Sequence, residues 1–188
     1  QLHARFADPT SDFLGLLKLW NHLEEQQKAL SSSAFRRLCR SEFLNYLRIR
    51  EWQDLYRQLI RAGSSLGIKA GDAKVDGDGI HKSLLAGLLS RIGLRDDRVK
   101  QSPKDRRVIE YLGARNQRFA IFPGASLAKK GPPAVMAAEL VETSRLFART
   151  VAAIDPAWAE DLAGNLVKRS DGEPRWEKRQ GSAVADEK

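Results

Sequence analysis

Apolar residues recur at helical spacing through the first half of the chain. Between positions 10 and 30 an apolar residue occurs every three or four positions, which predicts a helix. The sequence Thr10-Ser11-Asp12 at the start of this segment is typical of a helix N-terminus. The same spacing predicts a short helix at 34–40, a long one at 41–61 and another at 80–92, with a glycine-rich loop over 63–79. Because these helices can bury one another's apolar faces, we expect residues 1–93 to form a helical bundle that folds by itself.

The pattern changes after residue 93. Residues 94–108 have almost no apolar side chains and include Pro103, which predicts an exposed linker. Short strands are predicted at 111–114, 118–122, 135–143 and 147–154, although a helix over 134–140 competes with the third, and Asp155-Pro156 predicts the start of a helix. Several short strands around one helix are typical of a small, partly open barrel such as an oligonucleotide-binding (OB) fold. The expected fold class is therefore α+β, a small helical bundle followed by an incomplete barrel.

The charge of the chain favours a polyanionic partner. Lys and Arg number 32 against 24 Asp and Glu, which gives a formal charge of +8 and a pI near 9.8. Residues 95–130 alone hold ten basic side chains against four acidic ones. A compact basic domain usually binds nucleic acid, and less often the ribosome or an acidic membrane. No run of about 18 apolar residues and no signal-like start is present, so the expected location is the cytoplasm, without membrane contact.

Residues that can act in catalysis or bind a metal ion do not occur together in any known catalytic or metal-binding pattern. The three histidines are isolated, and the single cysteine, Cys39, falls at helical spacing among apolar residues and is expected in the core. No phosphate-binding Gly-x-x-x-x-Gly-Lys-[Ser/Thr] loop and no Asp-Glu-Ala-His box occur. We therefore assign no catalytic residue, no metal ligand and no cofactor to this chain, and expect no ATPase activity from it.

Two long stretches resemble a known family. The first is HARFADPTSDFLGLLKLWNHLEEQQKALSSSAFRRLCRSEFLNYLRIREWQDLYRQL, which resembles the helical, ratchet-like region of bacterial DEAH-box RNA helicases of the HrpA type. The second comprises YLGARNQRFAIFPGASL, AAELVETSRLFARTVAAIDPAWAEDLA and LVKRSDGEPRWEKRQG, which resemble the OB fold that follows it. The resemblance implies a helical domain at 1–93, a basic linker at 94–108 and a truncated OB fold at 109–188.

The same resemblance implies a parent protein with two motor domains that use ATP and Mg²⁺. The implied partners are single-stranded RNA and those motor domains, with the ribosome as a further candidate. Basic and small polar side chains that can hold an RNA backbone are predicted to do so here, and they are Asn45, Arg48, Arg50, Arg115, Arg118, Ser126, Lys129, Lys130, Thr143, Ser144 and Arg145.

Each of these residues also has a plainer interpretation as a solvated surface side chain, or, in the helical half, as a contact to the motor domains. Trp20, Trp52 and Trp158 could stack on bases, but their helical spacing favours core packing. The accessory RNA-binding function has two rivals: a protein-interaction module that docks a ribosomal or regulatory partner, and an inert piece of a truncated product.

Overall fold

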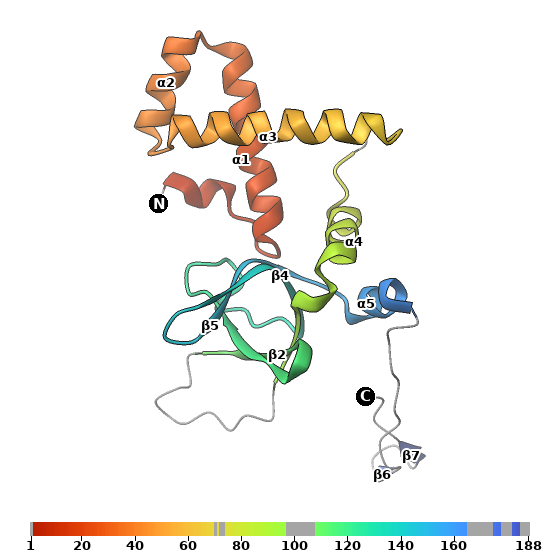
Figure 1. Cartoon of the computed structure of the whole chain (residues 1–188). Helices are drawn as coiled ribbons and strands as arrows, with labels where there is room; N and C mark the ends of the chain where they lie inside the picture. The colour runs from red at the N-terminus through yellow and green to blue at the C-terminus, as the bar shows by residue number, and fades with distance from the viewer. Residues whose placement is uncertain are drawn as a thin grey trace.

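The computed structural model describes residues 2–69, 71, 74–96 and 108–164, together with the backbone of 175–177 and 182–184. Three helices form one part of the molecule and a five-stranded barrel forms the other, with a fourth helix along the side of the barrel (Figure 1). The helical elements are η1 (Leu2–Phe6), α1 (Asp12–Ala29), α2 (Ser32–Ser41), α3 (Tyr46–Ser65), α4 (Gly77–Leu88), η2 (Leu89–Arg91), η3 (Ala114–Asn116) and α5 (Pro156–Ala163). The strands are β1 (Ile92–Arg95), β2 (Glu110–Gly113), β3 (Arg118–Ile121), β4 (Ala134–Glu142), β5 (Leu146–Ala153), β6 (Arg175–Glu177) and β7 (Ser182–Val184).

Polar caps start the first three α-helices close to where the sequence predicts them. Ser11 Oγ accepts a hydrogen bond from the Leu14 N–H, and Ser31 Oγ accepts one from the Ala34 N–H. The third helix begins at Tyr46 rather than at residue 41, because Asn45 caps it and the preceding chain turns at Phe43 with a φ of 55°. Phe43, within the segment predicted to begin that helix, lies outside it and is 82% exposed.

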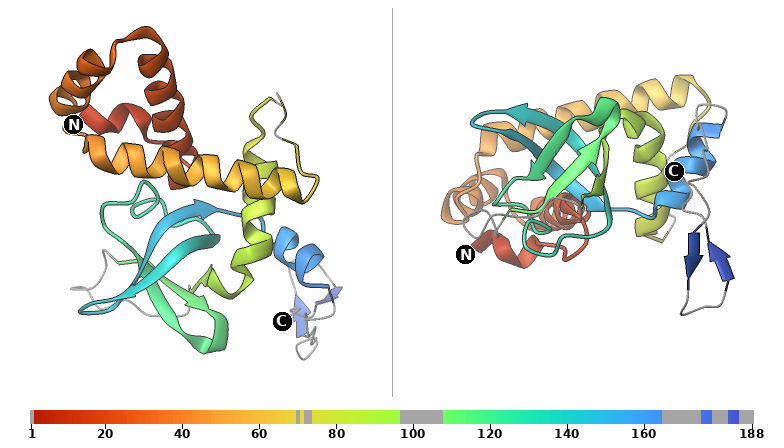
Figure 2. Two further views of the ribbon diagram at one scale, coloured as in Figure 1. Left: turned by 45° about the horizontal axis from the view of Figure 1, so that its top comes forward. Right: turned by 90° about the horizontal axis from the view of Figure 1, so that it is seen from below.

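The helices α1, α2 and α3 share a small core of their own. It contains Leu23, Phe35, Cys39 and Ile49, and the expected core position of Cys39 is confirmed by its complete burial. Trp20 and Trp52 pack edge to face with 4.9 Å between ring centroids, as their spacing predicted. Long α3 crosses above the barrel in Figure 2 and joins this core mainly through its first half.

The barrel is closed, in the strand order β1-β2-β3-β5-β4. All neighbouring strands are antiparallel except β3 and β5, which run parallel. Its interior is filled by Tyr111, Phe119, Leu127, Val135 and Val151, among others. The four predicted strands are confirmed, and the segment 134–140, which could also have been a helix, is a strand.

The expected α+β fold, a helical part followed by a barrel, is confirmed, but the barrel is closed rather than partly open and it begins at β1, which spans the predicted boundary at residue 93. Residues 92–95 form strand β1, which pairs with β2 on one side and with β4 on the other and so closes the barrel. Only Ile92 and Leu94 are apolar in this short strand. Because Gly93 and Arg95 alternate with them, the sequence predicted the end of a helix followed by a linker. Most of that linker, residues 97–107, lies outside the described residues.

Helix α4 packs on the barrel and does not join the predicted bundle. Its buried Leu85 lies in a second core with Ala134 and Met136 of β4 and Ala152 of β5. Partly buried Phe13 and Trp158 complete this core, so Trp158 packs as its spacing predicted. The bundle of mutually buried helices therefore excludes residues 80–92, and the argument that 1–93 folds by itself loses its basis. No helix among the described residues is long and apolar enough to span a membrane.

A buried histidine ties α4 to the start of α1. The Nε2 atom of His81 lies 2.8 Å from Ser11 Oγ, both residues are buried, and Ser11 Oγ already accepts the Leu14 N–H. Depending on its tautomer, a neutral His81 either accepts a hydrogen bond from the Ser11 hydroxyl or donates one to it. Burial lowers the pKa of His81 below its ordinary value of 6.5, against the opposing influence of Asp78 and Asp8.

His81 should make the stability of the protein sensitive to mild acid. Because the folded state holds His81 neutral while the unfolded chain takes up a proton below pH 6.5, the free energy of unfolding should fall as the pH drops through that value. Urea unfolding at about pH 7.5 and pH 5.5 measures this loss. His81→Gln should show a smaller loss over the same interval, since His3 and His22 remain in both proteins. An equal pH dependence of the two proteins would contradict the prediction.

Candidate nucleic-acid interface

The outer face of β2 and β3 is the first place where predicted RNA-binding residues meet. In OB folds this face and the connections β1–β2 and β4–β5 bind oligonucleotides and oligosaccharides. Here the β1–β2 connection is the basic stretch, of which residues 97–107 lie outside the described residues, and the β4–β5 connection is Thr143–Arg145. Arg118 on β3 and Arg145 in the β4–β5 turn are 27 positions apart in sequence, yet both lie beside Glu110 of β2.

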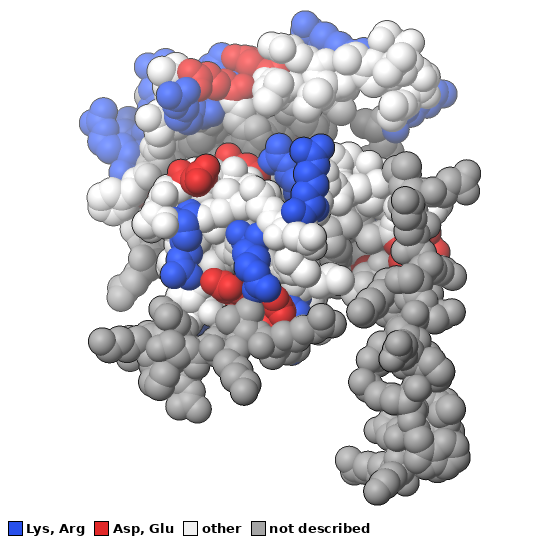
Figure 3. All heavy atoms as spheres, turned by 60° about the horizontal axis from the view of Figure 1, so that its bottom comes forward, with Lys and Arg blue, Asp and Glu red and all other residues white. Residues whose placement is uncertain are grey.

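Acidic neighbours balance part of the charge on these two arginines. Arg118 Nη1 lies 2.7 Å from Asp96 Oδ2 and 3.7 Å from Glu110 Oε2, and Arg145 Nη1 lies 3.9 Å from Glu110 Oε1. Both guanidinium groups stay accessible, since the side chain of Arg118 is 50% exposed and that of Arg145 is 42% exposed. Figure 3 shows Lys and Arg side chains interspersed with acidic ones on this side of the molecule, so the described residues visible there form no continuous basic patch.

The turn between β4 and β5 presents three predicted residues together. The Thr143 N–H donates to the Arg145 carbonyl oxygen at 3.0 Å, which closes the turn and leaves the side chains of Thr143, Ser144 and Arg145 exposed. Arg115 lies in η3, the turn of the β2–β3 hairpin, three residues before Arg118, and it adopts a φ of 57°. Arg118 and the β4–β5 turn share Glu110 as a neighbour, whereas Arg115 has no ion pair with Glu110.

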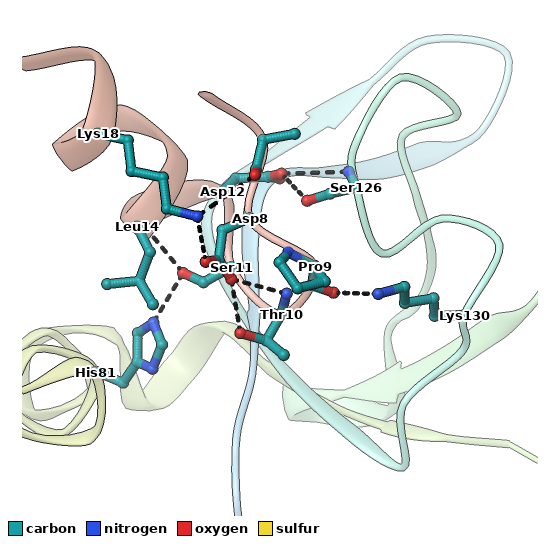
Figure 4. Close-up of polar contacts among 11 residues, drawn as sticks. Asp8, Pro9, Thr10, Ser11, Asp12, Leu14, Lys18, His81, Ser126 and Lys130 are labelled. Carbon is teal, nitrogen blue, oxygen red and sulfur yellow. Dashed lines mark hydrogen bonds and ion pairs between the residues drawn. The ribbon is translucent and has the colours of Figure 1, made fainter. Parts of the chain in front are cut away.

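The loop between β3 and β4 is tied to the helical part of the molecule (Figure 4). Ser126 donates from its N–H and its hydroxyl to Asp12 Oδ1, at 3.2 and 2.6 Å. Lys130 Nζ donates to the Pro9 carbonyl oxygen at 2.8 Å. Both side chains thus have structural partners, whereas Lys129, which is exposed like Lys130, makes no hydrogen bond or ion pair within the described part of the chain. Lys129 is therefore the member of this group best placed to reach a phosphate.

Asp12 also accepts a hydrogen bond from a backbone N–H group where the β4–β5 hydrogen-bond ladder is interrupted. Thr150 has a φ of 51°, a left-handed conformation that costs a β-branched residue about 1–3 kcal/mol. The register pairs Ala137 with Val151 and Glu139 with Arg149 but leaves out the pair between them. The Val151 N–H donates instead to Asp12 Oδ2 at 3.0 Å, and the Ala138 carbonyl accepts from the Arg91 guanidinium. Asp12 thus holds both barrel segments that face α1.

The predicted residues of α3 are partly engaged within the helix. Asn45 Oδ1 accepts from the Leu47 and Arg48 N–H groups, so Asn45 is a helix cap. The Arg48 guanidinium lies 2.8 Å from Glu51, in an exposed pair of the kind that contributes little to stability. Arg50 Nη1 lies 3.5 Å from the Tyr46 hydroxyl. Hydrogen bonds from Arg36 and then Arg50 lower the pKa of Tyr46.

Arg36 belongs with Arg50 at this place and was not predicted from the sequence. Its guanidinium carbon lies 5.0 Å from the centre of the Tyr46 ring. The residues were missed because they belong to different helices, α2 and α3, whose packing the sequence pattern does not specify. A second set was also missed on the barrel, where Phe122, Phe147 and Arg149 lie on one outer surface. Alternation at the start of β5 puts Phe147 and Arg149 on this outer side, opposite buried Ala148, and the turn of the backbone at Thr150 then brings Val151 into the core.

Comparison with known proteins agrees with this arrangement. A family model described as an oligonucleotide/oligosaccharide-binding (OB) fold matches residues 80–166, which include α4 as well as the barrel. Over 99% of this chain, 55% of the residues are identical to the ATP-dependent RNA helicase HrpA of Escherichia coli, and 51% to the HrpA homolog of Haemophilus influenzae. The chain is homologous to a segment of the HrpA-type RNA helicases. The resemblance noted in the sequence is thereby confirmed.

The chain spans only 14% of the length of these two HrpA proteins. A more distant HrpA, from Borreliella burgdorferi, is 24% identical over 88% of this chain and 18% of its own length. The crystal structure of the E. coli DExH-box NTPase HrpB is also similar, with a TM-score of 0.46 and 19% identity over 73% of this chain and 15% of that one. The relatives therefore carry long regions for which this HrpA-type segment has no counterpart.

Proposed function

We propose that this chain is the accessory RNA-binding portion of an ATP-dependent RNA helicase. In this proposal it holds the backbone of single-stranded RNA while motor domains elsewhere in the longer protein bind ATP and Mg²⁺ and translocate. Phosphate contacts from arginine, lysine and small polar side chains suit such a role, because they do not depend on the base sequence. The observation that carries the proposal is the meeting of Arg118 with the Thr143–Arg145 turn on the β2–β3 face, where OB folds bind their ligands.

The ion pairs on this face fit the proposal. Arg118 and Arg145 share Glu110, and a phosphate that approaches the face can replace a carboxylate as the partner of either guanidinium. Both side chains are about half exposed, so they can change partners without rearrangement of the barrel. The basic β1–β2 connection begins at the same edge, next to Asp96. The proposed contacts to phosphate are therefore made by positive charges that lie together around one strand edge.

Loss of the two arginines should reduce the salt dependence of RNA binding. In the double variant Arg118→Ala/Arg145→Ala, the slope of log affinity against log salt should fall by roughly 1.4, at about 0.7 for each single-strand phosphate contact. The measurement is fluorescence anisotropy of a labelled single-stranded RNA against the 188-residue chain at several salt concentrations.

The matched control is Arg57→Ala/Arg61→Ala, which removes the same charge from exposed positions on α3. The control should weaken binding only through net charge and leave the slope nearly unchanged. If both double variants have the same slope, the β2–β3 face does not hold the phosphates. If the unchanged chain binds no RNA at low salt, the proposed function itself fails.

The lysines of the β3–β4 loop should behave differently from one another. The sequence alone predicts one phosphate contact for each, but Lys130 Nζ bonds to the Pro9 carbonyl while Lys129 is exposed. In the same titration, Lys129→Ala is expected to change the salt slope and Lys130→Ala chiefly to loosen the link between the loop and α1.

A feature of α3 favours protein docking as a second function. Its exposed side chains include Leu55, Leu59 and Ile60, and Leu66 follows directly after the helix with 77% of its surface exposed. A contiguous exposed apolar surface is typical of a protein contact. We propose that motor domains of the same longer protein cover it, rather than a ribosomal partner. Addition of the motor region in trans should then protect α3 from hydrogen exchange.

A further inference from the structure

A groove of about 900 Å³ lies between the N-terminal segment and the barrel. Phe6, Leu16 and Leu19 line it from η1 and α1, and Phe122 and Arg149 line it from the barrel. This volume falls within the range of pockets that hold small organic ligands. The groove is distinct from the β2–β3 face, because it is built by the end of β3, by β5 and by the helical part together.

The carboxylates that line the groove already have partners within the protein. Lys18 Nζ lies 2.8 Å from Asp8 Oδ2. Although burial by itself raises the pKa of Asp8, hydrogen bonds from Lys18 and Thr10 outweigh it and lower that pKa to about 2. Both oxygens of Asp12 accept hydrogen bonds from neutral donors of the barrel. The ion pair with Lys18 therefore offsets the charge of Asp8, and the oxygens of Asp12 are engaged within the protein.

Arg149 is the cation that remains for a ligand in the groove. Within the described part of the chain it has no ion pair at 4.0 Å or less, although Glu139 lies opposite to it in the β4–β5 register. Its guanidinium carbon lies 4.8 Å from the centre of the Phe122 ring, and that ring is edge-on to Phe147. Phe122 remains 38% exposed. The guanidinium group thus lies over one face of the aromatic ring, at the wall of a groove whose lining is both apolar and polar.

Regular alternation at the start of β5 puts Arg149 outside the barrel, because the preceding residue, Ala148, lies in the barrel core. The left-handed Thr150 then shifts the alternation, so that Val151 also lies in the core. A strained residue held by surrounding contacts often occurs at a functional site. Here the strained residue lines the groove directly beside Arg149, and Asp12 bonds to the backbone next to it.

We propose that this groove binds one unstacked nucleotide of single-stranded RNA, with the base against Phe122 and a phosphate on Arg149. The inference rests on the proposed function and adds a base contact to its backbone contacts. Bases stack on aromatic rings whatever their identity, and arginine can donate two parallel hydrogen bonds to phosphate. The groove would therefore strengthen binding to single-stranded RNA of any sequence.

The test of the base contact compares RNA with and without bases. The intact 188-residue chain should bind a short oligouridylate more tightly than an abasic ribose-phosphate of equal length. Phe122→Leu, which keeps apolar bulk but has no aromatic face, should weaken oligouridylate binding by roughly 5- to 150-fold and abolish the difference. Phe122→Tyr should retain it. The matched control is Phe43→Leu, at an aromatic residue that is 82% exposed in the helical part and should have no effect.

The phosphate contact is tested by charge at position 149. Arg149→Gln should reduce the salt slope by roughly 0.7, while Arg149→Lys should keep it near the original value. Photocrosslinking of the unchanged chain with 4-thiouridine RNA provides a readout that needs no variant, and it should modify residues around 122–126. Crosslinks only elsewhere, or an unaltered base preference in Phe122→Leu, overturn the inference while salt-dependent binding leaves the proposed function standing. A chain that binds no RNA overturns both.

Discussion

Replacement of Asp12 by alanine is expected to lower the free energy of unfolding by about 2–4 kcal/mol. The carboxylate accepts hydrogen bonds from the Ser126 N–H and hydroxyl and from the Val151 N–H. A buried donor that loses its partner costs about 1–3 kcal/mol, and hydrogen bonds to a charged group are the stronger kind. Asp12 also lies in the first turn of α1, where a negative charge is favourable. Urea denaturation at neutral pH measures the change.

Ser126→Ala is the matched control for Asp12→Ala. It removes one hydroxyl donor and leaves both backbone N–H groups bonded to the carboxylate, so a loss of about 1 kcal/mol is expected. Hydrogen exchange adds a local readout, because the Val151 amide should lose protection in Asp12→Ala and keep it in Ser126→Ala. Equal stability of Asp12→Ala and the unchanged protein would show that Asp12 does not hold the broken ladder of β4 and β5.

Replacement of Gly93 by alanine should also destabilise the barrel strongly, by roughly 3 kcal/mol. A Cβ at this position would come within 2.3 Å of Phe119 Cζ and within 2.9 Å of Tyr111 Cβ. The Phe119 ring is buried, and Tyr111 Cβ is fixed to the backbone of β2, so neither can move away without disturbing the core. Added volume in a close-packed interior typically costs 1–3 kcal/mol and occasionally more. Thermal or urea unfolding measures the loss.

Gly87→Ala is the comparison that separates this clash from the general effect of a methyl group. Gly87 lies in α4 with open space where its Cβ would be, so alanine there should stabilise the protein by about 0.4–1 kcal/mol. The two substitutions are chemically identical and should have opposite signs. A destabilisation of similar size at both positions would refute the packing argument for Gly93.

Local chemistry in the sequence determined most of the secondary structure. Ser11, Ser31 and Asn45 cap helices because their side-chain oxygens reach N–H groups only two or three residues ahead, so neighbouring residues suffice to predict them. Helix and strand periodicities are local for the same reason, and they gave the α+β class and four of the five barrel strands. The positive charge and the resemblance to HrpA-type helicases were likewise readable from residues in order along the chain.

Contacts between distant residues decided the rest. Strand β1 is only four residues long, and Gly93 and Arg95 hide its alternation, so pairing with β2 and β4 is what identifies it as a strand and closes the barrel. The partners of Ser126 and Lys130 lie 114 and 121 positions away, and no local pattern could separate these residues from exposed Lys129.

The candidate groove was hidden from the sequence for the same physical reason. Arg149, Phe122 and the helical residues that line the groove come from distant parts of the chain. The left-handed turn at Thr150, which also lines it, is held by Asp12, whose carboxylate bonds to the Val151 N–H across 139 positions of sequence. A strained conformation of a single residue is stable only when surrounding contacts compensate for it, and those contacts exist only once the chain has folded. The sequence by itself therefore determined the elements and their charge, while the tertiary structure decided which side chains share a surface.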